Sequence, residues 1–240
     1  MVLIKQKTEE VNVEGKDQKV TYGILNWGPC IVQLKIDKAF QDKLLQGGLE
    51  AQKENLDYRK KLAGILKEEY AFKKKEDYLP EIAQCLGIYD AAYQKWKNEA
   101  YDKKPNYMLT ALWTNFMHKH EFNPVHDHSD TLSFVIFLKV PEEIKQEQRD
   151  NLGKSGGPGS LAFIYGEGTR QAITYQSIIP NEGDMFIFPA WVKHYVAPFY
   201  SDVTRISVSG NITDTVPLNS IHKHVKAEQV SADQVEKGRE

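Results

Sequence analysis

The clearest hydrophobic pattern in the chain falls within residues 80–100. Large apolar side chains recur there at spacings of four, three, four and three, at Ile82, Leu86, Tyr89, Tyr93 and Trp96. Residues at these spacings lie on one face of an α-helix. Proline suits the first turn of a helix. The pattern therefore predicts a helix over Pro80–Ala100, with the apolar stripe packed into the core rather than used to bind a cofactor.

The lysine and glutamate residues of the first hundred positions mostly alternate with each other, which is typical of solvated helix faces. Two short strand candidates, Lys19–Leu25 and Cys30–Ile36, come first. We expect a mainly helical stretch, about 37–104, to follow them.

After Pro105 the pattern changes to short apolar runs that are rich in β-branched and aromatic residues and are separated by Gly, Pro, Asn and Asp. Such runs predict β-strands. The main predicted strands are Tyr107–Met117, Leu132–Val140, Leu161–Tyr165, Ala172–Ile179, Met185–Phe188 and Thr204–Asn211. Shorter strands are expected at Asn123–His128 and Tyr195–Phe199.

Asn181–Asp184 is a strong turn signal, and the glycine-rich segment Asn151–Ser160 predicts a loop, either a surface loop or a lid. About eight strands after a helical preface indicate a mainly β fold with α-helices, a double-sheet jelly roll with the helices packed on one sheet. We expect one domain over 1–211, with its jelly-roll core at about 105–211. Residues 212–240 are polar and non-periodic, and we expect them to form a tail.

The composition excludes several classes of protein. A chain of 240 residues with 41% apolar content can bury one sizeable core. A net charge of −2 gives no sign of nucleic-acid binding, and no apolar run is long enough to span a membrane. The first residues are too short a hydrophobic run for a signal peptide, so Cys30 and Cys85 are expected to be free buried thiols in a cytoplasmic protein.

Histidine placement is the strongest chemical signal. The seven histidines are His118, His120, His126, His128, His194, His222 and His224. The segment Asn123–Asp130 holds two of them and two aspartates. In an extended strand alternate side chains share a face, so His126, His128 and Asp130 would point together while Asp127 points away. We expect His118 and His120 to lie on the surface and the last two histidines to be solvated in the tail.

A third ligand should return to the same place from another strand, and His194 fits. It follows a Gly-Asp turn, a short apolar strand and Pro189, which would put it at the mouth of the barrel. Two ligands close in sequence and a distant third give the facial arrangement of non-haem iron(II) sites, which leaves three coordination positions open.

Arg205 and Ser207 alternate with the apolar residues Ile206 and Val208 on the last predicted strand. By the period of two, Arg205 and Ser207 are expected to point to the same side of that strand. An inward arginine is costly unless an anion pairs with it. A guanidinium beside a hydroxyl can hold a carboxylate in bidentate fashion. Strand positions add candidates for the pocket wall, with Asn115 also assigned to the cofactor site: Trp113, Asn115, Phe134, Leu138 and Trp191.

In these residues the chain resembles the 2-oxoglutarate/iron(II)-dependent oxygenase superfamily, and more narrowly its prolyl-hydroxylase-like phage and bacterial hydroxylases. The resemblance rests on NPVHDHSDTLSFVIFLKVP, GDMFIFPAWVKH and RISVSGN and covers roughly 107–211; NWGPCIVQLKI and Leu62–Gly64 match more weakly. It implies a double-stranded β-helix (a cupin-like jelly roll), Fe(2+), and hydroxylation of a substrate with O2 and 2-oxoglutarate, releasing succinate and CO2. It also implies that Arg205, with Ser207 beside it, binds the distal carboxylate of 2-oxoglutarate.

The ligand set has two readings. The usual motif of the superfamily, His-x-Asp, maps to His128 and Asp130, whereas the narrower group's His-x-His maps to His126 and His128. An Asp130 ligand would require the chain to leave the metal and begin a strand at Leu132 almost at once. A turn at residues 129–131 avoids this and slightly favours His126. His128 is a ligand in both readings.

Two other functions remain as alternatives. One is a cupin-like metal-dependent dioxygenase or isomerase without 2-oxoglutarate, which the inward Arg205 and Ser207 disfavour. The other is a non-catalytic jelly-roll binding module, which the cluster of histidines and aspartates disfavours. The sequence does not distinguish a small-molecule substrate from a peptidyl one, and it gives no oligomeric state.

Overall fold

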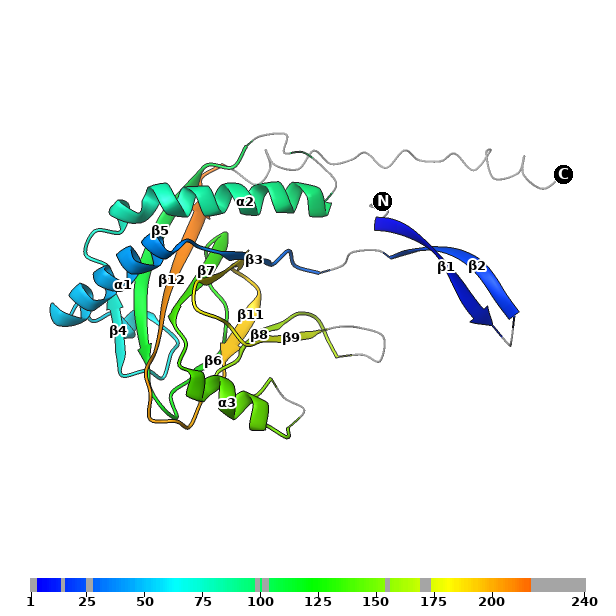
Figure 1. Cartoon of the computed structure of the whole chain (residues 1–240). Helices are drawn as coiled ribbons and strands as arrows, with labels where there is room; N and C mark the ends of the chain where they lie inside the picture. Colours follow the sequence, from blue (N-terminus) through cyan, green and yellow to red (C-terminus); the bar gives the residue numbers. More distant parts are fainter. Residues whose placement is uncertain are drawn as a thin grey trace.

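The computed structural model describes residues 4–13, 16–24, 28–97, 100, 104–153, 156–168 and 174–216, of which the first two ranges are described by their backbone. Figure 1 shows the whole chain. The predicted tail lies outside the described residues from position 217 onward, and His222 and His224 lie there with it. Leu25, the end of the first predicted strand, is also outside them.

Two long helices precede the jelly roll. The first, α1, spans Lys38–Lys53 and begins where the side chain of Asp37 accepts a hydrogen bond from the backbone of Phe40 at 2.8 Å, which satisfies one of the free N–H groups of the first turn. The second, α2, spans Leu79–Lys97 and matches the predicted helix, with Pro80 in its first turn. A third helix, α3 (Glu142–Asp150), was not predicted.

The region before residue 105 is less helical than its lysine and glutamate content indicated. Two short 3-10 helices, η1 (Arg59–Lys61) and η2 (Lys75–Tyr78), flank a strand, β4 (Glu68–Ala71). The stretch of about 37–104 that we expected to be mainly helical therefore also contains the strand β4, which was not predicted. The four residues of β4 are too few to show a period of two clearly, and charged Glu68 and Glu69 occupy half of the strand.

Each predicted strand after Pro105 has a counterpart; Tyr107–Met117 has the predicted ends and the others are shifted, while Ala172, the predicted start of one strand, lies outside the described residues. The observed strands are β5 (Tyr107–Met117), β6 (Asn123–His126), β7 (Leu132–Lys139), β8 (Leu161–Ile164), β9 (Tyr175–Ile178), β10 (Asp184–Pro189), β11 (Lys193–Val196) and β12 (Arg205–Asp214). Earlier in the chain lie β1 (Ile4–Val13), β2 (Lys16–Ile24) and β3 (Val32–Lys35). The unpredicted β1 pairs with β2 in a separate hairpin.

Two antiparallel sheets form the jelly roll, which is the predicted double-stranded β-helix. The larger sheet has the order β3-β10-β7-β12-β5-β4, and the smaller has the order β6-β11-β8-β9. Helices α1 and α2 cover the outer face of the larger sheet (Figure 1). The described helices include none that is long and apolar enough to cross a membrane.

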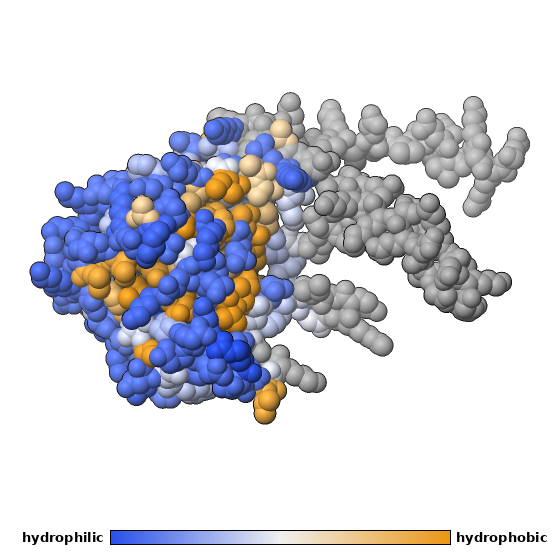
Figure 2. Space-filling model, viewed as in Figure 1, coloured by the Kyte–Doolittle hydropathy of each residue, from blue (hydrophilic) through white to orange (hydrophobic). Residues whose placement is uncertain are grey.

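Two hydrophobic cores follow from this layering. One lies between the helices and the larger sheet and includes Phe40, Leu44 and Ile82 from the helices and Ile136 and Val208 from the strands. The other lies between the two sheets. Its members include Phe137, Phe163, Phe186, Phe188 and Phe199. Hydrophilic residues surround a band of hydrophobic ones on the face seen in Figure 2, where α1 and α2 turn their polar sides to solvent.

Alternation along the strands decides which side chains enter the space between the sheets. On β5 the inward positions include Trp113, Asn115 and Met117, and on β12 they include Arg205 and Ser207. This inner space holds the polar groups that the sequence singled out.

Candidate metal and co-substrate site

Three histidines meet at one end of the space between the sheets. His126 on β6 pairs directly with His194 on the adjacent strand β11. His128 follows two residues after the end of β6, and its backbone N–H donates to the carbonyl of Ala190 at 2.9 Å. One ring nitrogen from each histidine lies within 4.8 Å of the other two. Such a group of imidazole nitrogens can hold a transition metal ion.

Hydrogen bonds fix the ring tautomer of two of these histidines. The Nδ1 atom of His126 lies 2.7 Å from the carbonyl oxygen of Pro124, and the Nδ1 atom of His194 lies 2.9 Å from that of Val192. A carbonyl oxygen can only accept, so each Nδ1 carries the hydrogen and donates it. The lone pair of each neutral ring is therefore on Nε2, which is the arrangement that metal-ligating histidines adopt.

The electrostatics of the cluster favour the neutral form of His128 and His194. Burial, and then the neighbouring His126, lower the pKa of His128 to about 4. The same two causes lower the pKa of His194 to about 3. Metal ions bind the neutral form of imidazole, so no proton has to be displaced from these two rings at neutral pH. The donor set fits iron(II), for which imidazole is a suitable ligand.

Asp130 does not join the three histidines. Its Oδ1 atom accepts hydrogen bonds from the hydroxyls of Thr110 at 3.0 Å and Thr213 at 2.7 Å. The strand ends at His126, so the alternation that would have put Asp130 beside His128 does not continue to it. Of the two ligand sets that the sequence left open, the structure gathers His126, His128 and His194.

Arg205 lies inside the barrel with 3% of its surface exposed. Its guanidinium donates to the carbonyl of Gly159 at 2.8 Å, contacts the sulfur of Met117 and packs over the ring of Phe137, and its Nε atom has no hydrogen-bond partner. No acidic side chain in the described ranges pairs with it. Burial lowers the pKa of Arg205 to about 10, so the group remains charged at neutral pH. An uncompensated buried cation of this kind requires an anion.

A row of polar side chains crosses three neighbouring strands beside Arg205. Glu69 on β4 pairs with Asn115 on β5, which pairs with Ser207 on β12. The amide of Asn115 donates to the hydroxyl of Ser207 at 3.3 Å and accepts from the indole of Trp113 at 3.1 Å. The predicted cofactor-site residues Asn115, Arg205 and Ser207 therefore lie together on the inner face of the larger sheet.

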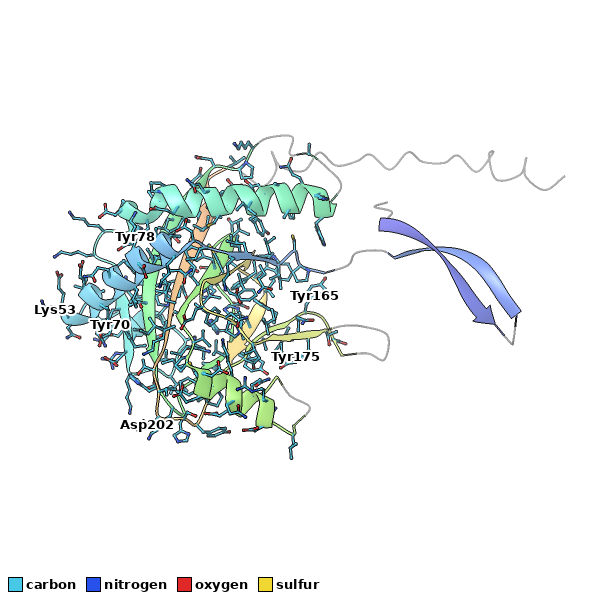
Figure 3. The ribbon with its side chains drawn as sticks, viewed as in Figure 1. Lys53, Tyr70, Tyr78, Tyr165, Tyr175 and Asp202 are labelled. Atoms are coloured by element: carbon cyan, nitrogen blue, oxygen red, sulfur yellow. The ribbon has the colours of Figure 1, made fainter. Side chains whose placement is uncertain are left out.

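One cavity of about 200 Å³ joins these groups. Its wall includes the three histidines, Arg205, Ser207 and Asn115, together with Trp113, Phe134, Phe137 and Phe188. The side chains packed between the sheets are drawn in Figure 3, where Tyr165 and Tyr175 mark the β8–β9 end.

Two predicted wall residues are wrong. Leu138 packs in the core on the helix side of β7, because the inward residue of that pair is Phe137. Trp191 is 54% exposed and its ring lies 5.8 Å from that of Tyr165, outside the wall of this cavity. His118, which pairs with Glu68 at 2.7 Å, and His120, which lies against Tyr200, are apart from the cluster.

Sequence reasoning missed Glu69 and Asn123, which also line the cavity. Glu69 was taken as part of a solvated helix face, because it stands among lysines and glutamates. Asn123 is three residues before His126 on the same strand, and that spacing was the only sequence signal for it.

Comparison with known families gives a match over the same part of the chain. Residues 111–211 match the family described as "Putative 2OG-Fe(II) oxygenase". No curated protein matches the chain in sequence.

Solved structures are similar in fold at low sequence identity. A prolyl-4-hydroxylase from Pseudomonas putida is 13% identical, with a TM-score of 0.51 and coverage of 78% of this chain and 93% of that one. The non-heme alpha ketoglutarate dependent carbocyclase SnoK from nogalamycin biosynthesis is 12% identical, with a TM-score of 0.50 and coverage of 77% and 79%. At this identity the two structures establish the shared fold.

The family match covers β5 to β12, the strands that carry the three histidines, Asn115, Arg205 and Ser207. That superfamily uses Fe(2+) and 2-oxoglutarate, and the donor set and the unpaired arginine described above fit both. Residues 111–211, which carry these side chains, are therefore similar in sequence to the 2-oxoglutarate/iron(II)-dependent oxygenases, and the chain shares its fold with solved members of that group.

Proposed function

We propose that the protein is a hydroxylase in which His126, His128 and His194 hold iron(II) and Arg205 anchors the distal carboxylate of 2-oxoglutarate. The observation that carries the proposal is one cavity with two complementary ends. Three histidines with free ring nitrogens line it at one place, and a buried arginine without an anionic partner lines it at another.

Each end has a defined task. The carbonyls of Pro124 and Val192 orient the rings of His126 and His194, so that their Nε2 atoms face the same point. Arg205 offers its unpaired Nε and guanidinium edge to a carboxylate, with the hydroxyl of Ser207 on the same face of β12. Asn115 donates to Ser207 and so orients that hydroxyl.

Iron(II) held by the three histidines, together with 2-oxoglutarate, would supply the chemistry of an O2-dependent hydroxylation, in which the co-substrate would be converted to succinate and CO2. The protein positions the partners and excludes water. Phe137 and Phe188, 1% and 2% exposed, give the cavity a dry wall.

The size of the cavity bears on the substrate. Pockets for drug-sized ligands begin at about 300 Å³, and this one measures about 200 Å³. We propose that it admits the co-substrate and the reacting part of the substrate, such as one side chain of a peptide. The prolyl-4-hydroxylase among the structures of similar fold is in keeping with a peptidyl substrate.

The test is formation of succinate from 2-oxoglutarate by the iron-loaded protein, first alone and then with peptide and metabolite pools. We expect slow turnover alone and faster turnover with the pool that contains the substrate. Arg205→Met should raise the 2-oxoglutarate concentration needed for half-maximal turnover by about 30-fold or more. Metal-dependent consumption of O2 by Arg205→Met without succinate would instead support the cupin-like alternative.

A further inference from the structure

Glu69 is a buried carboxylate that the proposed iron and 2-oxoglutarate sites do not use. It lies on β4, is 1% exposed and lines the cavity, and its Oε2 atom has no hydrogen-bond partner among the described residues. A carboxylate buried in this way costs free energy of folding. A residue with a purely structural role would not be expected to carry that cost.

The neighbouring charged groups leave Glu69 unpaired. Glu121 is buried nearby, but its two oxygens accept hydrogen bonds from the backbone of Lys67 and His118. Arg59 donates twice to Asp57. Lys61 lines the same cavity as Glu69, and its ammonium lies 5.4 Å from the ring centroid of Tyr58. In the described part of the chain, no cationic side chain forms an ion pair with Glu69.

A second unpaired acceptor lies close to Glu69. The Oδ1 atom of Asn123 is buried without a partner and also belongs to the cavity wall. A Cβ atom on Gly64 would lie closer than 3.0 Å to both Asn123 Oδ1 and Glu69 Oε1. The two oxygens are therefore less than about 6 Å apart. A charged N–H donor bonds to oxygen at about 2.7–2.9 Å, so a single ammonium nitrogen can reach both.

This acceptor pair is separate from the place of the co-substrate carboxylate. Glu69 is two strands away from Ser207 in the register of the sheet, or about 10 Å at the usual strand spacing. A carboxylate would be repelled by Glu69 and attracted by Arg205. The cavity therefore has an anion-binding end and a cation-binding end, both near the histidine cluster.

We infer that Glu69 and Asn123 bind an ammonium group of the substrate, so that the substrate class is an amine or an amino-acid residue with a free amino group. This inference rests on the proposed oxygenase function and names the substrate class of that same site. Burial, and then the charge of Glu121, raise the pKa of Glu69 to about 7, which is the behaviour of a carboxylate that lacks its cationic partner.

The test is anaerobic calorimetry on the full chain loaded with iron(II) and 2-oxoglutarate. Two matched pairs of probes are titrated, n-butylammonium against n-butanol and Nα-acetyl-L-lysine methylamide against Nα,Nε-diacetyl-L-lysine methylamide. We expect each cation to bind with one-to-one stoichiometry and at least about tenfold more tightly than its neutral counterpart. Glu69→Gln should remove this preference, and Asn123→Leu should reduce it.

Glu68→Gln is the matched control. Glu68 is the adjacent residue on β4, bonds to Gln52, Tyr70 and His118, and lies outside the cavity wall, so its variant should keep the preference for cations. Thermal unfolding checks the fold of each variant. Removing the unpaired charge should leave Glu69→Gln at least as stable as the wild type without substrate.

The two proposals fail in different ways. Equal binding of cation and neutral probe, no binding of any probe while 2-oxoglutarate still binds, or an unchanged preference in folded Glu69→Gln would each overturn the inference and leave the proposed function standing. Failure of the iron-loaded protein to bind 2-oxoglutarate would count against the proposed function itself.

Discussion

His126 and His194 are directly paired residues of two neighbouring strands, and their ring centroids lie 4.2 Å apart. Each ring donates its Nδ1 hydrogen to the carbonyl two residues earlier in the chain. The same kind of local hydrogen bond thus orients both rings. His128, which follows the end of β6, completes the group, and its ring centroid lies 5.1 Å from that of His126.

Removal of one ring from this group should abolish stoichiometric metal binding. We expect His194→Ala to lower the affinity for iron(II) by at least about 100-fold, since losing even an indirect support of a metal ligand costs 10–100-fold. Metal content after dialysis measures this. His118→Ala is the control, because His118 bonds to Glu68 outside the cluster and its loss should leave the iron content unchanged. Equal metal loss in both variants would speak against the assignment.

Asp130→Ala separates the two ligand sets that the sequence left open. Asp130 accepts hydrogen bonds from Thr110 on β5 and Thr213 on β12, so we expect its loss to lower the free energy of unfolding by about 1–3 kcal/mol. Urea denaturation measures that change. The iron content of the folded variant should stay at one per chain, and a variant that folds but no longer retains iron would show that Asp130 is a ligand.

Arg205→Met should weaken 2-oxoglutarate binding by about 30-fold or more, because loss of one partner from a buried charge pair costs about 2–5 kcal/mol. Methionine keeps an apolar side chain over the ring of Phe137. Equilibrium binding to the iron-loaded protein measures the effect. Arg149→Met removes an exposed arginine of α3 and serves as the control. Unchanged affinity in Arg205→Met would remove this residue from the co-substrate site.

Glu69 should impose a pH dependence on stability. Its pKa in the folded state, about 7, is above the ordinary value of 4.5, so the folded state binds the proton more tightly than the unfolded chain. The folded state therefore loses stability as pH rises from about 4.5 to about 7. At about 1.4 kcal/mol per pKa unit the loss is at most about 3 kcal/mol.

Urea denaturation from pH 4.5 to 7.5 measures this contribution as the difference between the wild type and Glu69→Gln. The groups that set the pKa of Glu69 are Glu121, Arg59 and Asp57, which both proteins share. The difference in stability should grow in favour of Glu69→Gln as pH rises. Parallel profiles would show that the pKa of Glu69 in the folded state is not raised.

The sequence predicted most accurately those helices and strands whose apolar residues recur with a regular period. The stripe from Ile82 to Trp96 gave α2, and the apolar runs after Pro105 gave the strands of the jelly roll, because their period follows from one buried face. The shared direction of Arg205 and Ser207 followed from their alternation with the apolar residues Ile206 and Val208 on β12.

Tertiary pairing decided the features that the sequence did not predict. Glu69 reads as a helix-surface residue, and only the pairing of β4 with β5 turns its side chain into the barrel. Both faces of β7 are buried, since Leu138 faces the helices and Phe137 faces the other sheet. Because both side chains are apolar, the sequence does not indicate which of them reaches the cavity. Asp130 left the expected face because β6 ends at His126.

The most direct test of the three-histidine centre with its arginine-anchored co-substrate is an anaerobic titration of iron(II) into the protein with 2-oxoglutarate, followed by visible absorption. We predict a charge-transfer band that saturates at one iron per chain, persists in Asp130→Ala, and is lost in His194→Ala. Absence of the band from the wild type, or its persistence in His194→Ala, would contradict the account.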